Sequence, residues 1–140
     1  MKLLFRIAFA LAASFPLTAM AEDAKPALGL ELNSIETLDG SCRLTFVLQN
    51  SLAEDIDALV AETVLFSEAG QVVLLTLFDF GALPVGKPRV RQFQVPSRPC
   101  DGLGQVLVNG VDTCEIAGAA DERCQSALSL SSRVRIDMAG

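Results

Sequence analysis

Short apolar runs separated by turn residues dominate the middle of the chain, between Cys42 and Pro96. The runs are rich in β-branched and aromatic residues, and glycine, proline or asparagine interrupts them at intervals of roughly 8–12 residues. This rhythm is typical of antiparallel strands in a sandwich or a barrel. The stretch also holds all the phenylalanines that follow residue 21, so we expect the core to be built here, around Phe46, Phe66, Phe78, Phe80 and Phe93.

Residues 1–21 have the features of a signal peptide. Lys2 and Arg6 form a short positive region, and the apolar run that follows is too short to span a bilayer. The small-x-small pattern that signal peptidase reads is Ala19-Met20-Ala21. We therefore predict cleavage after Ala21 and a periplasmic mature protein. No later apolar run reaches the length of a membrane span, so we expect no transmembrane segment in the mature chain.

The exported part has the size of one domain. We predict a flexible leader over residues 22–27 and a single β-sandwich domain over residues 28–140. Without Lys2 and Arg6, 9 basic residues remain against 17 acidic ones, a net charge near −8. Nucleic-acid binding needs a basic stripe, so this charge argues against a nucleic-acid partner.

All four cysteines lie in the exported part, and an even number in a small exported domain predicts two disulfides. A zinc site is disfavoured, because the chain has no histidine and no Cys-x2-Cys spacing. Of the three possible connectivities we favour Cys42–Cys100 and Cys114–Cys124. Cys42 begins a strand that faces inward, and Cys100 lies in an irregular segment made rigid by two prolines. A bridge between them would fasten this segment to the strand. Cys114 and Cys124 enclose a short loop rich in alanine and glycine.

Alternation of apolar and polar residues assigns the faces of several strands. A first strand begins at Leu28, and the run over residues 42–49 faces inward with Cys42, Leu44, Phe46 and Leu48. The runs over residues 59–66 and 71–80 are apolar on both faces, which predicts a hairpin in the middle of a sheet. The expected core residues are Leu44, Phe46, Phe66 and Phe78.

The strand over residues 89–95 is basic at Arg89 and Arg91. Its parity changes along the strand, and a bulge near Arg91 or Gln92 would explain the change. The two arginines are candidates for binding an anionic ligand, but positive charge on an exposed strand more often discourages edge-to-edge pairing. We favour the protective role.

Later segments of the chain are also predicted to form strands. Residues 105–111 form one, and Asn109-Gly110 is a strong hairpin dipeptide within it. Residues 126–132 alternate as a further strand, and the tail over residues 134–138 is expected to pack on a sheet edge.

Two groups of carboxylates are candidate sites. Glu54, Asp55 and Asp57 form an acidic loop, but calcium usually needs six or more oxygens, so a solvated loop is favoured. Glu62 and Asp79 lie within apolar runs and are the candidates for carboxylate-pair catalysis. We expect Glu62 to face solvent and Asp79 to cap a strand instead.

One further pattern is formed by turn and core positions along the chain: Leu44, Asn50-Ser51, Ile56, Leu59, Val64-Leu65-Phe66, Gly70-Gln71-Val72-Val73, Leu83-Pro84, Gly86 and Phe93. This set resembles the FxLYD-type pattern, a small immunoglobulin-like sandwich of bacterial exported proteins. Two features depart from that pattern: Leu-Phe66-Ser-Glu replaces Leu-Tyr-Asp, and the four cysteines are extra. The whole mature chain is similar to uncharacterised periplasmic proteins of proteobacteria. The resemblance implies an immunoglobulin-like fold and supplies no catalytic residues.

The composition removes much catalytic chemistry. The chain has no histidine, tyrosine or tryptophan, so a Ser-His-Asp triad is impossible, and Gly-x-Ser-x-Gly does not occur. We expect no catalytic residue, cofactor or metal. The leading hypothesis is a non-enzymatic periplasmic immunoglobulin-like module that binds a protein or an envelope component. The alternatives are a small-ligand or ion-binding protein and a carboxylate hydrolase.

Overall fold

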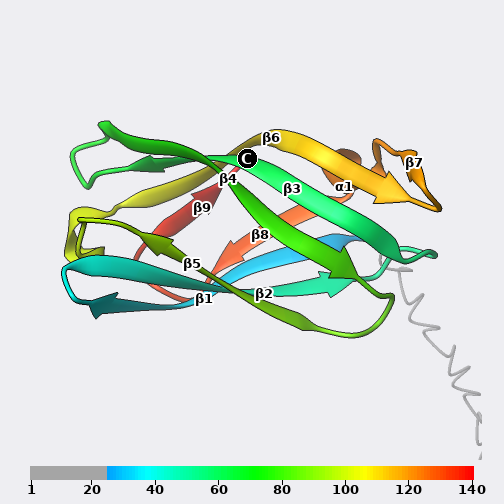
Figure 1. The fold of residues 1–140 in the computed structure, drawn as a ribbon, viewed down its shortest axis with the longest axis horizontal. Coiled ribbons are helices and arrows are strands. Elements are labelled where there is room, and N and C mark those ends of the chain that lie inside the picture. The colour runs from blue at the N-terminus through cyan, green and yellow to red at the C-terminus, as the bar shows by residue number, and fades with distance from the viewer. Residues whose placement is uncertain (1–24) are drawn as a thin grey trace, which may run out of the picture.

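The structure is a computed structural model that describes residues 25–140. The predicted signal peptide and its cleavage site lie outside these residues. Two β-sheets pack against each other, which confirms the predicted all-β, immunoglobulin-like sandwich (Figure 1). One sheet has the order β5-β2-β1-β8, and the other has the order β4-β3-β6-β7 with β9 also paired to β6. The strands are β1 (Leu28–Leu38), β2 (Ser41–Asn50), β3 (Ile56–Phe66), β4 (Val72–Leu83), β5 (Arg89–Val95), β6 (Gln105–Ile116), β7 (Ala119–Ala120), β8 (Leu128–Ser132) and β9 (Asp137–Ala139).

The first sheet is built on the β1–β2 hairpin. Asp39 and Gly40 connect the two strands with φ angles of 49° and 76°, the left-handed conformation that a two-residue hairpin turn requires. Along β2 every second residue is buried, which confirms that Cys42 and Phe46 face the core. On its other side β1 pairs in parallel with β8, so the chain's C-terminal part completes this sheet.

The second sheet is centred on β3, which pairs with β4 on one side and β6 on the other. The predicted middle hairpin is therefore half wrong, because β4 lies at the edge of the sheet. Its apolar residues are not all buried: the inner face packs on the core through Phe78 and Phe80, whereas Leu75 and Leu77 are exposed. In β4, a run of residues that is apolar on both faces therefore forms an edge strand and not a central one.

Strand β6 is longer than the sequence predicts. The Asn109-Gly110 dipeptide forms no hairpin: the strand runs through it, as predicted for residues 105–111, and only the register against β3 shifts nearby. The chain reverses instead at Ala117 and Gly118, whose φ angles are 52° and 74°. Ile116 then pairs with Ala119 in β7. The predicted packing of the tail on a sheet edge is confirmed by β9, which pairs in parallel with β6.

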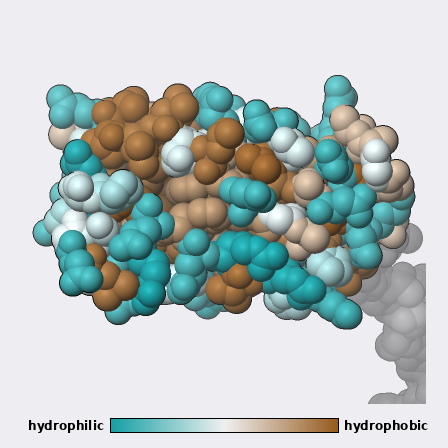
Figure 2. Space-filling model, viewed as in Figure 1, coloured by the Kyte–Doolittle hydropathy of each residue, from teal (hydrophilic) through white to brown (hydrophobic). Residues whose placement is uncertain are grey.

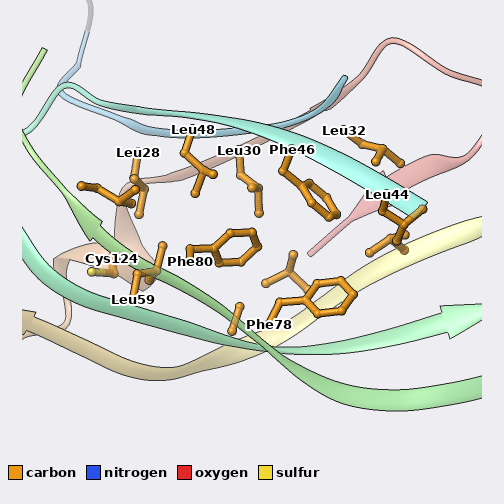
Figure 3. Packing of buried hydrophobic residues seen from close by; sticks show 14 of the residues in the cluster. Leu28, Leu30, Leu32, Leu44, Phe46, Leu48, Leu59, Phe78, Phe80 and Cys124 are labelled. Atoms are coloured by element: carbon orange, nitrogen blue, oxygen red, sulfur yellow. The ribbon is translucent and has the colours of Figure 1, made fainter. Parts of the chain in front are cut away.

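The core lies between the sheets, where Figure 3 shows the rings of Phe46, Phe78 and Phe80, and Phe93 packs against this cluster. Phe46 is 1% exposed, and its ring lies between 5.6 and 6.0 Å from three others, Phe78, Phe80 and Phe93. Leu44 and Phe78 are buried as predicted. The prediction for Phe66 is wrong: a register shift between Leu65 and Phe66 puts Leu65 in the core and leaves Phe66 half-buried.

Both predicted disulfides are present. Cys42–Cys100 joins β2 to the 3-10 turn η1 (Cys100–Gly102), and Cys114–Cys124 joins β6 to the short helix α1 (Arg123–Ser126). Each bridge anchors a segment that has few apolar residues of its own. Within residues 25–140 no cysteine is free.

A buried amide holds one end of the sandwich together. The side chain of Asn50 is 1% exposed and donates hydrogen bonds of 2.9 Å to the carbonyls of Glu54 and Leu83. Its oxygen accepts from the backbone N–H of Leu52. This end therefore has its polar groups satisfied, as a buried amide requires.

No helix in the described part of the chain is long and apolar enough to cross a membrane.

Candidate functional site

The four sheet edges differ in how they are protected. An exposed edge strand presents unpaired backbone groups, and proteins usually keep such strands short, charged or covered. Strand β8 has five residues, while the outer side of β6 is covered by β9, by β7 and by Gln125, whose side chain accepts a hydrogen bond from the N–H of Val111. The long edge strands are β5, with seven residues, and β4, with twelve.

Strand β5 carries two arginines that point toward the space between the sheets. Arg89 pairs with Leu48 and Arg91 with Phe46, in a register that runs without interruption to Val95. The predicted bulge near Arg91 is therefore wrong, and no change of face occurs. Both arginines share the inner face with Phe93 and Val95. An inward-pointing charge on an edge strand is one of the known devices against edge-to-edge pairing.

Arg91 also covers part of the edge of β4. Its Nε donates to the carbonyl of Phe80 at 2.8 Å, and a terminal nitrogen lies 3.4 Å from the carbonyl of Ala82. In Figure 1, β5 runs beside the C-terminal half of β4. Arg89 donates to the carbonyl of the adjacent Pro88. These contacts favour the protective role of the arginine pair over anion binding.

The N-terminal half of β4 has no comparable guard. We call residues 72–78 the open edge: within the described sheets they pair with β3 on one side only. Val72, Leu75 and Leu77 are 61%, 60% and 52% exposed, respectively. Figure 2 shows apolar atoms gathered at the upper left, where the β3–β4 hairpin lies in Figure 1.

The open edge is paired with β3 along one side and carries no charged residue. No ionisable residue occurs between Gln71 and Phe78. Leu75 lies opposite Val64 of β3, which is itself only 7% exposed. On the inner face the hydroxyl of Thr63 donates to the carbonyl of Thr76 at 3.0 Å. Unpaired backbone groups beside an apolar face are what an added strand uses for binding.

The acidic loop does not assemble an ion site. Asp55 accepts from the N–H of Val85 at 2.7 Å, and Asp57 accepts from the N–H of Gly118 at 3.1 Å. Glu54 instead forms an ion pair of 2.9 Å with Arg123. The three carboxylates thus fasten three different segments. Nowhere in residues 25–140 do three or more acidic or cysteine side chains gather in a way that could hold a metal ion.

Glu62 and Asp79 also have structural partners. Glu62 is half-buried and accepts a hydrogen bond from the side chain of Asn109. Asp79 is exposed and accepts from the N–H of Gly81 at 2.9 Å. Asp79 lies opposite Val60 in the sheet, whereas Glu62 lies opposite Leu77. The two carboxylates therefore face no common buried space, and the pair lacks the setting of an acid–base couple.

A shallow depression of about 550 Å³ lies beside α1. Asp112, Asp121 and Glu122 contribute to its lining. Hydrogen bonds from the side chain and backbone of Arg123 hold the pKa of Asp121 below its ordinary value of 3.8. The carboxylate of Asp121 is thus already paired with Arg123 of the same chain and is not free to bind a ligand.

Comparisons with known proteins add a likeness of fold. No protein-family model matches the sequence, and no curated protein matches it. A solved structure described as the structural characterization of IrmA from Escherichia coli superposes with a TM-score of 0.61 at 14% sequence identity. The match covers 76% of this chain and 92% of that one. At this identity the likeness concerns the fold alone, and the FxLYD-type resemblance stays a prediction.

Proposed function

We propose that this chain is a non-enzymatic, immunoglobulin-like binding module of the periplasm. Its open edge takes up an extended segment of a periplasmic or envelope protein as an additional strand. The observation that carries this proposal is the contrast between the edges. Arg89 and Arg91 guard β5, whereas the open edge exposes Val72, Leu75 and Leu77 and carries no charge.

Strand addition divides recognition between backbone and side chains. Backbone hydrogen bonds along β4 supply affinity, and side chains at alternate positions supply specificity. On the outer face, Leu75 and Leu77 favour a partner segment with apolar residues at every second position. Burying apolar surface contributes about 25 cal/mol per Å² removed from water.

The open edge is preorganised for this role. Strand β4 is fixed against β3, and Phe78 stacks on Phe93 of the opposite sheet with ring centroids 4.2 Å apart. A strand that is already ordered loses little conformational freedom when a partner binds. The partner segment then bears most of the ordering cost, which suits a flexible tail or linker.

The periplasmic location rests on the signal-peptide pattern and suits the two disulfides, which persist in oxidising compartments. The intact mass of the protein recovered from the periplasm should correspond to a chain that begins at Glu22. A full-length product confined to the cytoplasm would contradict this part of the proposal.

Photo-crosslinking in the native cell tests the partner site. A benzophenone amino acid is placed at Leu77 of the open edge and, in a matched control, at Val90 on β5. The two residues are similarly exposed, Leu77 at 52% and Val90 at 56%. We expect a discrete adduct with another envelope protein from position 77 only. Adding Leu75→Glu should abolish the adduct, because it sets a charge into the apolar edge. Equal adducts from both positions, or none from position 77, would overturn the proposal.

A further inference from the structure

We infer that a second copy of this chain occupies the open edge when no other partner does, in a two-fold antiparallel pairing of β4 with β4. The inference uses the same edge as the proposed function, and it names a different occupant. The pairing would join the two β4-β3-β6-β7 sheets into one continuous sheet across the dimer.

The matching of apolar side chains on the outer face favours one register. In an antiparallel pair, residues opposite each other project from the same face, so outward residues must meet outward residues. With the two-fold axis at Thr76, Leu75 of each copy lies opposite Leu77 of the other. The four leucines then form a cluster on the outer face. On the inner face the same register sets Leu74 opposite Phe78.

The charges permit this register although the chain is acidic overall. The carboxylate nearest the pair on the same strand is Asp79, and it falls opposite Val73 of the other copy. The two Asp79 residues lie at opposite ends of the pairing, six positions apart along a strand, or roughly 20 Å at about 3.4 Å per residue. That separation exceeds the screening length of about 8 Å at physiological ionic strength. No like charges face each other directly.

The size of the surface predicts a weak dimer. A stable interface buries about 800 Å² on each partner. One edge strand with three aliphatic side chains that are already partly covered supplies less than that. We therefore expect a reversible dimer with a dissociation constant in the range of about 10 μM to 1 mM. A stronger partner would displace the second copy, so dimerisation and partner binding would exclude each other.

Sedimentation velocity of residues 22–140, from about 1 μM to several mM, tests the dimer. The wild type should shift from monomer to dimer with rising concentration. Leu75→Glu should remain monomeric throughout, because each copy sets a carboxylate against Leu77 of the other. The matched control is Val90→Glu, which adds the same charge at an equally exposed position on β5 and should dimerise as the wild type does.

A charge exchange tests the register. In the double variant Leu75→Glu with Leu77→Lys, the Thr76-centred pairing places each new carboxylate opposite a new ammonium group, so the dimer should return at low salt and weaken at high salt. In a pairing centred on Leu75, the two new carboxylates would face each other. A double variant that stays monomeric would therefore overturn the Thr76 register.

The remaining outcomes separate this inference from the proposed function. A wild type that stays monomeric up to several mM, or a dimer that survives Leu75→Glu, would overturn the β4–β4 pair. If position 77 still crosslinks to another envelope protein in that case, the proposed function stands alone. If position 77 crosslinks only to a second copy of this chain, the dimer stands and the proposed function falls.

Discussion

The Nε of Arg91 on β5 donates a 2.8 Å hydrogen bond to the backbone carbonyl of Phe80 on β4. This contact ties the edge of one sheet to the edge of the other. The same guanidinium reaches toward the carbonyl of Ala82 and donates to that of Val90. One side chain therefore covers the C-terminal part of β4, so that only the part of β4 before Asp79 is left open.

Replacing Arg91 should weaken the link between the edges. Arg91→Ser leaves the carbonyls of Phe80 and Ala82 without their donor, and a hydrogen bond from a charged group contributes about 1.5–3 kcal/mol, with the lower end applying at this half-exposed site. We expect a loss in the free energy of unfolding of about 1.5 kcal/mol, measured by urea denaturation. Aggregation should also rise, because the exposed edge becomes longer.

Arg89→Ser is the matched control for that variant. It removes the same charge from the same strand, but the hydrogen bond of Arg89 goes to the adjacent Pro88 and not to β4. We expect a change in the free energy of unfolding below about 0.5 kcal/mol. Equal losses in both variants would mean that charge alone, and not the link to β4, accounts for the effect.

Phe46 should be the most sensitive aromatic position. Its ring contacts three other phenylalanine rings and is 1% exposed, so Phe46→Ala should lower the free energy of unfolding by about 3–5 kcal/mol. Phe66→Ala is the comparison, because that side chain is half-buried. Thermal or chemical denaturation should show a clearly smaller loss for Phe66. A loss under about 1 kcal/mol for Phe46 would contradict its place in the core.

The sequence predicts strands well where alternation and local turns determine them. Cys42, Leu44 and Phe46 alternate with polar residues, and Asp39-Gly40 closes the hairpin, so the inward face of β2 is predictable. The parallel pairings of β8 with β1 and of β9 with β6 join segments far apart in the chain. Such non-local pairings leave no mark in a local pattern. The local preference of Asn109-Gly110 for a turn does not prevail, because β6 pairs with β3 on both sides of this dipeptide.

The open edge could not be identified from the sequence, although its residues stand out. A run such as Val72 to Phe78 is expected for a central strand with both faces covered and equally for an edge that binds a partner. The choice depends on which strands lie beside β4, and that is a property of the whole fold. Arg89 and Arg91 were predictable as edge guards by their charge. That Arg91 reaches across to Phe80 was not.

The ion pairs of α1 predict a dependence on pH. Hydrogen bonds from Arg123 hold the pKa of Asp121 below 3.8 in the folded protein. A carboxyl whose pKa is lowered by folding stabilises the folded state above its unfolded pKa, and this contribution is lost as the pH falls through the folded pKa. We expect Asp121→Asn to be less stable than the wild type at pH 7. The difference should shrink as the pH falls below about 3.8.

The control for the pH series is Asp101→Asn. Asp101 also lies in a short turn, and within residues 25–140 it forms no ion pair. Urea midpoints of the two variants and the wild type, compared from pH 7 to the lowest pH at which all remain folded, check the prediction. A difference for Asp121→Asn that does not change with pH would mean that its carboxylate charge is not what stabilises α1.

The two disulfides should differ in their effect on stability, because they close loops of different length. Cys42–Cys100 spans 58 residues and Cys114–Cys124 spans 10. In the chain-entropy model the first stabilises the fold by about 4 kcal/mol and the second by somewhat under 3 kcal/mol. We expect the double variant Cys42→Ala with Cys100→Ala to lose more stability than Cys114→Ala with Cys124→Ala.

Peptide mapping without reduction checks the pairing, and urea denaturation checks the order of the effects. The first bridge lies in the core, with Cys42 at 0% and Cys100 at 5% exposure, so its removal also leaves a gap beside β2. The open edge lies on the sheet opposite Cys42. Cys114 is on β6 of the same sheet as the open edge, but β3 lies between them. Crosslinking from position 77 should therefore persist without Cys114–Cys124, and a loss of the adduct in that folded variant would show that α1 takes part in binding.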